Sequence, residues 1–214
     1  MKMNHLIKKI KELEISRINY IIKKRLKEFG SFKNKNKKEW FSELCFCILT
    51  ANSKANSALK IQGELGVNGF CECSLNDVKK CIMKHKHRFH NNKTNYIIEA
   101  RKYIDIKSKI QQIIKKKGEL EAREWLVQNI KGIGYKEASH FLRNVGYRNI
   151  AILDRHILNL MLENNYIEER PKTLTKKKYL YIEEIFKEIA DNLKMSMAEL
   201  DLYMWYMKTG EVLK

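Results

Sequence analysis

Proline is almost absent from this sequence, with one residue, Pro171, among 214. Runs of alternating β-branched residues are also missing, so β-strands have little support. No stretch approaches the roughly 18 consecutive apolar residues that a membrane-spanning helix needs. The first residues, Met1–Glu14, mix lysine with glutamate and lack the apolar core of a signal peptide. We therefore expect a cytoplasmic protein that is not bound to a membrane.

Cysteine is scarce, and an odd number of cysteines argues against a disulfide framework. The five residues are Cys45, Cys47, Cys71, Cys73 and Cys81. In a chain that is not secreted, reduced thiols are the simplest interpretation. A metal interpretation would combine Cys81 with His85, His87 and His90, but that spacing fits no standard zinc motif. We expect neither a metal nor a cofactor.

Acidic residues are heavily outnumbered. Asp and Glu total 25 against 43 Lys and Arg, which gives a formal net charge of +18. Such an excess predicts a polyanionic partner. A lysine-rich solvated surface is the alternative interpretation.

Helical periodicity is what the sequence has in place of strand patterns. In the segment around Leu44, apolar residues recur at positions i, i+3, i+4 and i+7, as they do again after Lys178. Ser74 and Ser196 are suitable N-cap residues, and Gly210 is a suitable end for the helix that Ser196 begins. We predict an all-α protein of about ten helices with short loops, among them a basic loop at residues 34–38.

The most informative segment is residues 121–146. It predicts one helix ending near Ile130, a turn over Lys131–Gly134 and a second helix beginning near Tyr135. Two glycines around Ile133 allow a sharp turn while the isoleucine packs between the helices. Free N–H groups at the start of the second helix would then bind phosphate, which contacts the DNA backbone without reading its sequence. An ordinary helix–turn–helix packing unit is the alternative.

Residues 130–158, with the motifs KGIGYKEASHFLRN and ILDRHIL, resemble the helix-hairpin-helix DNA glycosylase superfamily. Within it they are most similar to the archaeal-type, second class of 8-oxoguanine DNA glycosylase/lyases. The resemblance implies two helical subdomains that flank a DNA-binding cleft with a helix-hairpin-helix motif. We expect one glycosylase unit, 1–214, with a central subdomain at 35–130. The hairpin, 121–146, leads into a second subdomain at 147–214. Helices at 1–30, near the N-terminus, are expected to join this second subdomain.

The same resemblance implies a bifunctional enzyme that excises 8-oxoguanine and cleaves the strand at the abasic site by β-elimination. Its partners would be double-stranded DNA containing 8-oxoguanine and abasic-site DNA, and we expect a monomer. Two features depart from the superfamily pattern. The loop before the aspartate lacks the frequent proline, and no cysteine follows Cys81, which rules out a C-terminal cysteine-ligated iron–sulfur cluster in this sequence.

Lys136 and Asp154 match the catalytic pair of the resembled family. Lys136 lies within GIGYK and would attack the sugar C1′ to form a Schiff base, which requires an unprotonated amine. We expect the helix N-terminus and nearby cations such as Lys131 to favour that form. Asp154 would stabilise the cationic sugar, and it also suits the N-cap of a helix.

Other residues are predicted to contact DNA or the damaged base. Phe89 beside Arg88 resembles the wedge that fills the gap left by a flipped base, and an aromatic residue of the core is the alternative interpretation. Trp205 and Lys214, the last residue of the sequence, are candidates for base recognition. The remaining predicted DNA contacts are Asn52, Ser53, Lys131, Gly132, Ile133 and Gly134.

Two further functions stay open at this point. One is a glycosylase/lyase for oxidised pyrimidines, which the missing cysteine cluster and Lys214 disfavour. The other is a non-catalytic hairpin module that holds DNA, which would need the turn but neither Lys136 nor Asp154.

Overall fold

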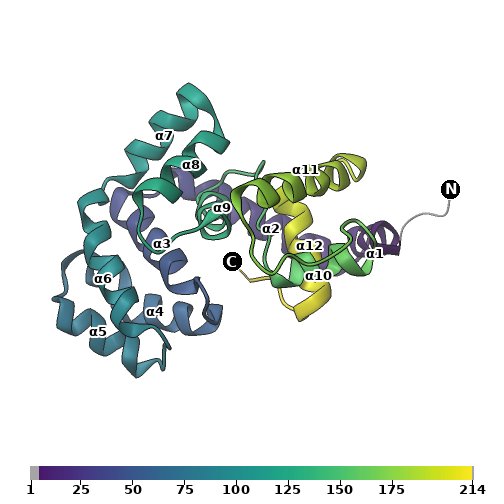
Figure 1. The fold of residues 1–214 in the computed structure, drawn as a ribbon. Helices are drawn as coiled ribbons and strands as arrows, with labels where there is room; N and C mark the ends of the chain where they lie inside the picture. The colour runs from purple at the N-terminus through teal and green to yellow at the C-terminus, as the bar shows by residue number, and fades with distance from the viewer. Residues whose placement is uncertain (1–4, 214) are drawn as a thin grey trace. The chain divides into compact units, whose positions relative to one another are not determined.

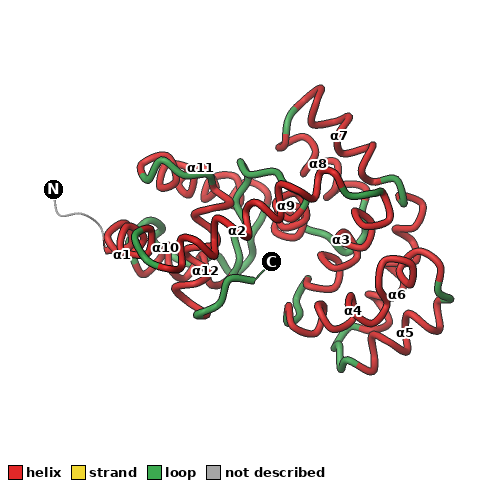
Figure 2. The backbone as a smooth tube through the Cα atoms, turned by 180° about the vertical axis from the view of Figure 1, so that it is seen from behind, coloured by secondary structure: helices red, strands yellow, loops and turns green. Residues whose placement is uncertain are grey.

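The computed structural model describes residues 5–213, which form helices and loops without a strand (Figure 2). The all-α prediction is confirmed, with twelve α-helices and two short 3-10 helices (η) in this part of the chain. In chain order they are α1 His5–Glu14, α2 Arg17–Ser31, η1 Phe32–Asn34, α3 Lys37–Thr50, α4 Ala55–Glu72, α5 Leu75–Lys84, α6 His90–Ala100, η2 Arg101–Tyr103, α7 Ile106–Lys117, α8 Glu119–Asn129, α9 Tyr135–Asn144, α10 Arg155–Glu163, α11 Lys176–Asn192 and α12 Met197–Thr209 (Figure 1).

The basic loop predicted at residues 34–38 is mostly helical instead. The 3-10 helix η1 ends at Asn34, and α3 begins at Lys37. Asn36 caps α3 because its side chain accepts the N–H of Glu39, whose carboxylate in turn accepts the N–H of Asn36. This reciprocal capping box outweighs the lysine-rich composition that suggested a loop.

The chain divides into two compact units. The first unit runs up to Ser31 and resumes at Leu142, and the second unit is Phe32–Phe141. Lys136 therefore belongs to the second unit and Asp154 to the first.

Helix α3 is the core of the second unit. All its residues from Trp40 to Thr50 are buried, and it packs against α4, α6 and α7. The Trp40 indole donates to the carbonyl of Phe32 at 2.9 Å and meets the Phe141 ring edge-on. A helix that is apolar on every side is stable only when neighbours surround it, and this arrangement supplies them.

Helix α12 has the corresponding place in the first unit, where it packs against α1, α2, α10 and α11. Its predicted ends are confirmed. The Ser196 hydroxyl accepts the N–H of Glu199 at 3.3 Å, and Gly210 ends the helix with φ +72°. Ser74 likewise caps α5, as predicted.

The residues before Asp154 form a buried, non-helical segment, 150–153. Its backbone polar groups find partners on α11, where Glu183 accepts the N–H of Ala151 at 2.9 Å. The Tyr179 hydroxyl donates to the Ala151 carbonyl at 2.8 Å. Because buried backbone groups are costly when unpaired, these bonds fix the path of the chain into Asp154.

No helix within residues 5–213 combines the length and the apolar character needed to cross a membrane.

Replacement of Tyr179 by Phe should lower the free energy of unfolding by about 1–3 kcal/mol, because the buried carbonyl of Ala151 loses its donor. Urea unfolding measures the change. The matched control is Tyr181→Phe on the same helix, whose side chain is 69% exposed and whose replacement should have no measurable effect. Equal stability of the two variants would show that the bond to Ala151 does not hold the segment.

Candidate active site and nucleic-acid interface

The predicted hairpin is present, with α8 ending at Asn129 and α9 beginning at Tyr135. Gly132, in the turn, has φ +83°, and a Cβ atom there would lie 2.3 Å from the Tyr96 ring. Ile133 is 7% exposed and packs into the unit as expected. The turn therefore requires glycine at position 132 for two reasons, its dihedral angle and its contact with Tyr96.

Glu137 closes the start of α9. Its Oε2 accepts the N–H of Gly134 at 3.2 Å, while the Gly134 carbonyl accepts the N–H of Ala138 at 2.9 Å. One of the N–H groups expected to be free for phosphate is therefore already bound. Glu137 was not among the residues predicted for the site, although an acidic residue at the third position of a helix is a recognisable capping signal.

Lys136 lies beside the same carboxylate, with its Nζ atom 2.9 Å from Glu137 Oε1. Its side chain is 30% exposed, so solvent and ligands can reach the amine. Only the helix N-terminus and nearby cations were expected around Lys136. The structure adds the carboxylate of Glu137 as a direct partner of the amine.

Lys93 is a second lysine in this region that sequence reasoning did not find. It is 5% exposed, and its Nζ donates to the carbonyl of Ile48 at 2.6 Å. Burial lowers the pKa of Lys93 to about 8, with Lys136 also lowering it and Glu137 opposing the shift. Lys131, by contrast, is exposed and pairs with Glu99 at 3.4 Å.

Asp154 is the N-cap of α10, as predicted. Its Oδ1 accepts the N–H groups of His156 at 2.8 Å and of Ile157 at 2.9 Å. No residue of the described part of the chain donates a hydrogen bond to the other oxygen, Oδ2. One carboxylate oxygen thus holds the helix start, and the other is available to a ligand.

A buried ion pair lies in the same unit, between Arg143 and Asp201 at 2.5 Å. Burial raises the pKa of Asp201 to about 6, the charge of Asp154 raises it further, and Arg143 opposes the shift. Asp201 is therefore a second carboxylate near Asp154, and Arg143 pairs with it. Nothing in the sequence pattern pointed to this residue, because its partner is 58 positions away.

Trp205 is half-buried on α12, and its ring meets that of His156 edge-on with 5.1 Å between centroids. Its indole Nε1 is buried and has no hydrogen-bond partner among the described residues. A buried donor without an acceptor is unusual, so this edge of Trp205 suits a ligand that offers one. Lys214 lies outside the described residues.

His87 links the loop of Phe89 to the last turn of α3, which directly precedes the loop of Asn52 and Ser53. Its Nε2 atom bonds the carbonyl of Leu49 at 2.8 Å, and its Nδ1 accepts the N–H of Phe89 at 3.3 Å. Leu49 precedes Asn52, an exposed residue with φ +56°. This use of His87 also removes it from the metal set considered with Cys81, His85 and His90.

Phe89 itself is half-exposed, and the Arg88 guanidinium lies 4.3 Å from the centroid of its ring. This arrangement presents an aromatic side chain beside a cation at the surface. Ser53 lies in a turn in which its N–H donates to the carbonyl of Thr50 at 3.1 Å. The roles of these residues in DNA contact stay predictions.

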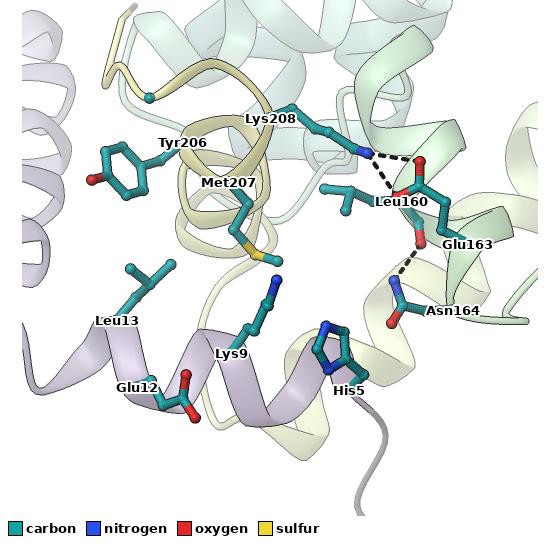
Figure 3. Close-up of a pocket in the computed structure, with 11 residues that line it drawn as sticks. His5, Lys9, Glu12, Leu13, Leu160, Glu163, Asn164, Tyr206, Met207 and Lys208 are labelled. Carbon is teal, nitrogen blue, oxygen red and sulfur yellow. Dashed lines mark hydrogen bonds and ion pairs between the residues drawn. The ribbon is translucent and has the colours of Figure 1, made fainter.

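The first unit contains a pocket of about 650 Å³ between α1, α10 and α12 (Figure 3). At its wall, Lys208 of α12 pairs with Glu163 of α10, with Lys208 Nζ 2.7 Å from Glu163 Oε2. Lys9 and Leu13 line the opposite side. None of the predicted site residues is among the described residues that line it.

Comparison with known proteins identifies a family for most of the chain. A family model described as 8-oxoguanine DNA glycosylase matches residues 22–195. An 8-oxoguanine DNA glycosylase/AP lyase of Methanocaldococcus jannaschii is 53% identical over 98% of this chain and 99% of its own length. A protein of the same name from Korarchaeum cryptofilum is 42% identical over the whole of both chains.

Solved structures give the same result. The crystal structure of the Methanocaldococcus jannaschii 8-oxoguanine glycosylase/lyase in complex with 15mer DNA containing 8-oxoguanine has a TM-score of 0.94. The match is 52% identical and covers 98% of this chain and 99% of that one. The 8-oxoguanine DNA glycosylase of Thermotoga maritima has a TM-score of 0.90 at 37% identity, with 98% of each chain covered.

Replacement of Gly132 by Ala should strongly destabilise the hairpin, because the new Cβ meets Tyr96 in addition to the unfavourable positive φ. Gly210→Ala is the matched control, since its φ is +72° and nothing lies within 4 Å of the added atom. The free energy of unfolding of that variant should fall only by the cost of a positive φ for alanine, about 1–2 kcal/mol. Urea unfolding and duplex binding measure both variants. If Gly132→Ala lost no more stability and duplex binding than Gly210→Ala, the close contact with Tyr96 would be contradicted.

Proposed function

Because the chain belongs to the 8-oxoguanine DNA glycosylase family, we propose that it excises 8-oxoguanine from double-stranded DNA and then cleaves the strand at the abasic site. The observation that carries the proposal is the position of Lys136. It is the second residue of α9, directly after the hairpin turn, and its amine is partly accessible. A module that only held DNA would need the turn but not a reactive amine at this position.

Lys136 is the nucleophile in this proposal. Its neutral amine attacks C1′ of the damaged nucleotide, the bond from C1′ to the base breaks, and the base leaves and takes up a proton. The C1′–O4′ bond then opens, O4′ takes up a proton, and the amine nitrogen, having lost its protons, forms a C=N double bond to C1′, which is the Schiff base. Loss of a proton from the sugar C2′ then allows β-elimination of the 3′ phosphate. The ammonium must first lose a proton, and Glu137 Oε1 is an acceptor within hydrogen-bond reach at 2.9 Å.

Asp154 supplies the negative charge that the reaction needs. The sugar becomes cationic as the base leaves, and a fixed carboxylate stabilises that charge. Because Oδ1 is held by the N–H groups of His156 and Ile157, the carboxylate does not have to reorganise during the reaction. Oδ2 is the oxygen proposed to face the sugar.

The remaining site residues are proposed to bind the DNA and the base. The hairpin residues Lys131, Gly132, Ile133 and Gly134 contact the phosphate backbone. Phe89, with Arg88, fills the gap left by the flipped nucleotide, and Asn52 and Ser53 face the base opposite. Trp205 stacks on or donates to the lesion, and Lys214 helps to distinguish it from guanine.

A glycosylase for oxidised pyrimidines is less well supported than an enzyme for 8-oxoguanine. The proteins named above carry the 8-oxoguanine name at 37–53% identity. The relatives are prokaryotic, so we also propose that the protein works in the cytoplasm at the nucleoid.

Borohydride reduction during the reaction with 8-oxoguanine DNA should yield a covalent protein–DNA adduct, because the reductant traps a Schiff base. Lys136→Gln should yield none, whereas Lys131→Gln, a matched change at an exposed hairpin lysine, should still be trapped. Gel electrophoresis separates the adduct from free protein. Trapping of Lys136→Gln at the wild-type level would place the nucleophile elsewhere.

Replacement of Asp154 by Asn keeps an Oδ1 acceptor for the helix cap but removes the charge. The free energy of unfolding should stay within about 0.5 kcal/mol of the wild-type value, since Asn and Asp cap helices about equally well. Excision should fall by roughly 100- to 1,000-fold. For Asp154→Ala, which also loses the cap, the free energy of unfolding should be about 0.5–2 kcal/mol lower than that of the wild type. If Asp154→Asn retained full excision, Asp154 would have only its structural role.

Deletion of Lys214 separates base recognition from lyase chemistry. An abasic site has no base to recognise, so its cleavage through Lys136 should be preserved. Excision of 8-oxoguanine should fall further, since an unpaired polar group costs about 1–3 kcal/mol. The measured quantity is the ratio of the two rates, and an unchanged ratio would remove Lys214 from the recognition site.

A further inference from the structure

A cluster of three metal-binding side chains lies between α4 and α5, outside the proposed catalytic site. Glu64 comes from α4, Cys81 from α5, and His85 from the residue that ends α5. Their ligand atoms all lie within 4.8 Å of one another. Cys81 and His85 are four positions apart at the end of one helix, which places both on the face that packs against α4.

The distances are close to those of a zinc site. With ordinary bond lengths, neighbouring ligand atoms of a tetrahedral zinc ion are roughly 3.4–3.6 Å apart. His85 Nε2 and Glu64 Oε2 are 2.8 Å apart, so the two groups must separate slightly to admit an ion. The Cys81 sulfur lies within 4.8 Å of both atoms, and rotation of side chains on a fixed backbone can bring the three groups to zinc-ligand distances.

The cluster is not a cysteine nucleophile, although it contains a thiol, an imidazole and a carboxylate. Cys81 is 6% exposed, and burial raises the pKa of its thiol to about 11, with Glu64 adding to the shift. A reactive cysteine needs the opposite environment, one that stabilises the thiolate. A divalent cation would supply that stabilisation.

We propose that Glu64, Cys81 and His85 bind a zinc ion, with the fourth position open to water. On binding, the Cys81 S–H bond breaks, its proton passes to solvent, and a sulfur–zinc bond forms. The thiolate and the carboxylate then balance the two positive charges of the ion, and His85 binds as neutral imidazole. This combination of sulfur, nitrogen and oxygen ligands suits zinc better than magnesium or calcium, which bind oxygen.

Lys84 is the competitor that a metal must displace. Its Nζ donates to Glu64 Oε1 at 3.0 Å, and its side chain is 66% exposed, so it can move into solvent. In the absence of metal it partly neutralises the carboxylate. Loss of the Lys84 charge should therefore strengthen metal binding, which loss of a structural contact would not do.

The site would fix the start of the loop that contains Phe89. His85 lies two residues before His87, which holds the loop to the carbonyl of Leu49. The turn between them passes through Lys86, whose φ is +53°. Zinc would therefore add a further anchor at the end of α5, next to the backbone bonds from Lys86 to Met83 and from His87 to Ile82.

Titration of the full-length protein with Co²⁺ tests the proposal, because cobalt in a zinc site with a thiolate ligand gives a charge-transfer absorption band. The wild type should show the band with one equivalent of Co²⁺, and Zn²⁺ should remove it. Zn²⁺ alone should also raise the Tm by several degrees, since a ligand that binds only the folded state stabilises it.

Variants identify the ligands. Cys81→Ser should lose the band, and His85→Gln should weaken binding at least tenfold. The double variant Cys71→Ser/Cys73→Ser should keep the band, which controls for the nearby Cys-x-Cys pair. Lys84→Gln should bind more tightly than the wild type. No band in the wild type, or an equal band in Cys81→Ser, would overturn the proposal and leave the cluster as a hydrogen-bonded contact between helices.

Discussion

The carboxylate of Glu137 is the interaction on which the proposed active site depends. One of its oxygens accepts the N–H of Gly134 and so closes the hairpin turn, while the other contacts the amine of Lys136 at 2.9 Å. Because a single buried side chain makes both contacts, the turn that is proposed to bind the DNA backbone also positions the proposed nucleophile. The charge of Glu137 also opposes the lowering of the pKa of Lys93, a buried lysine whose Nζ donates to the carbonyl of Ile48.

The first unit positions Asp154 by a different physical device. The preceding segment is buried without being helical, so its polar groups must be paired, and Tyr179 and Glu183 pair them from α11. Asp154 then ends the segment by capping α10 with one oxygen. The second oxygen remains available, and the buried Arg143–Asp201 ion pair lies close enough for the charge of Asp154 to raise the pKa of Asp201. The two units thus place their reactive groups through hydrogen bonds to backbone rather than through side-chain packing alone.

Local features of the fold could be predicted from the sequence. The hairpin boundaries and the caps at Ser74, Ser196 and Asp154 depend on residues within four positions of each other, and the structure has them where the pattern indicated. The prediction of a loop at residues 34–38 was wrong, because the lysine-rich composition suggested a loop whereas Asn36 and Glu39 form a capping box that starts a helix. The contacts of His87 with Leu49, of Lys93 with Ile48 and of Arg143 with Asp201 join residues 38, 45 and 58 positions apart. No periodicity in one sequence specifies such pairs.

The most direct test of the account is to find which residue carries the DNA in the reduced adduct. Proteolysis of the trapped complex, followed by mass spectrometry of the peptide that retains the sugar fragment, identifies the modified amine. We expect a single modified residue, Lys136, in a peptide from the start of α9. Modification of Lys131, Lys93 or any other lysine in its place would contradict the claim that the hairpin turn and Glu137 position the nucleophile.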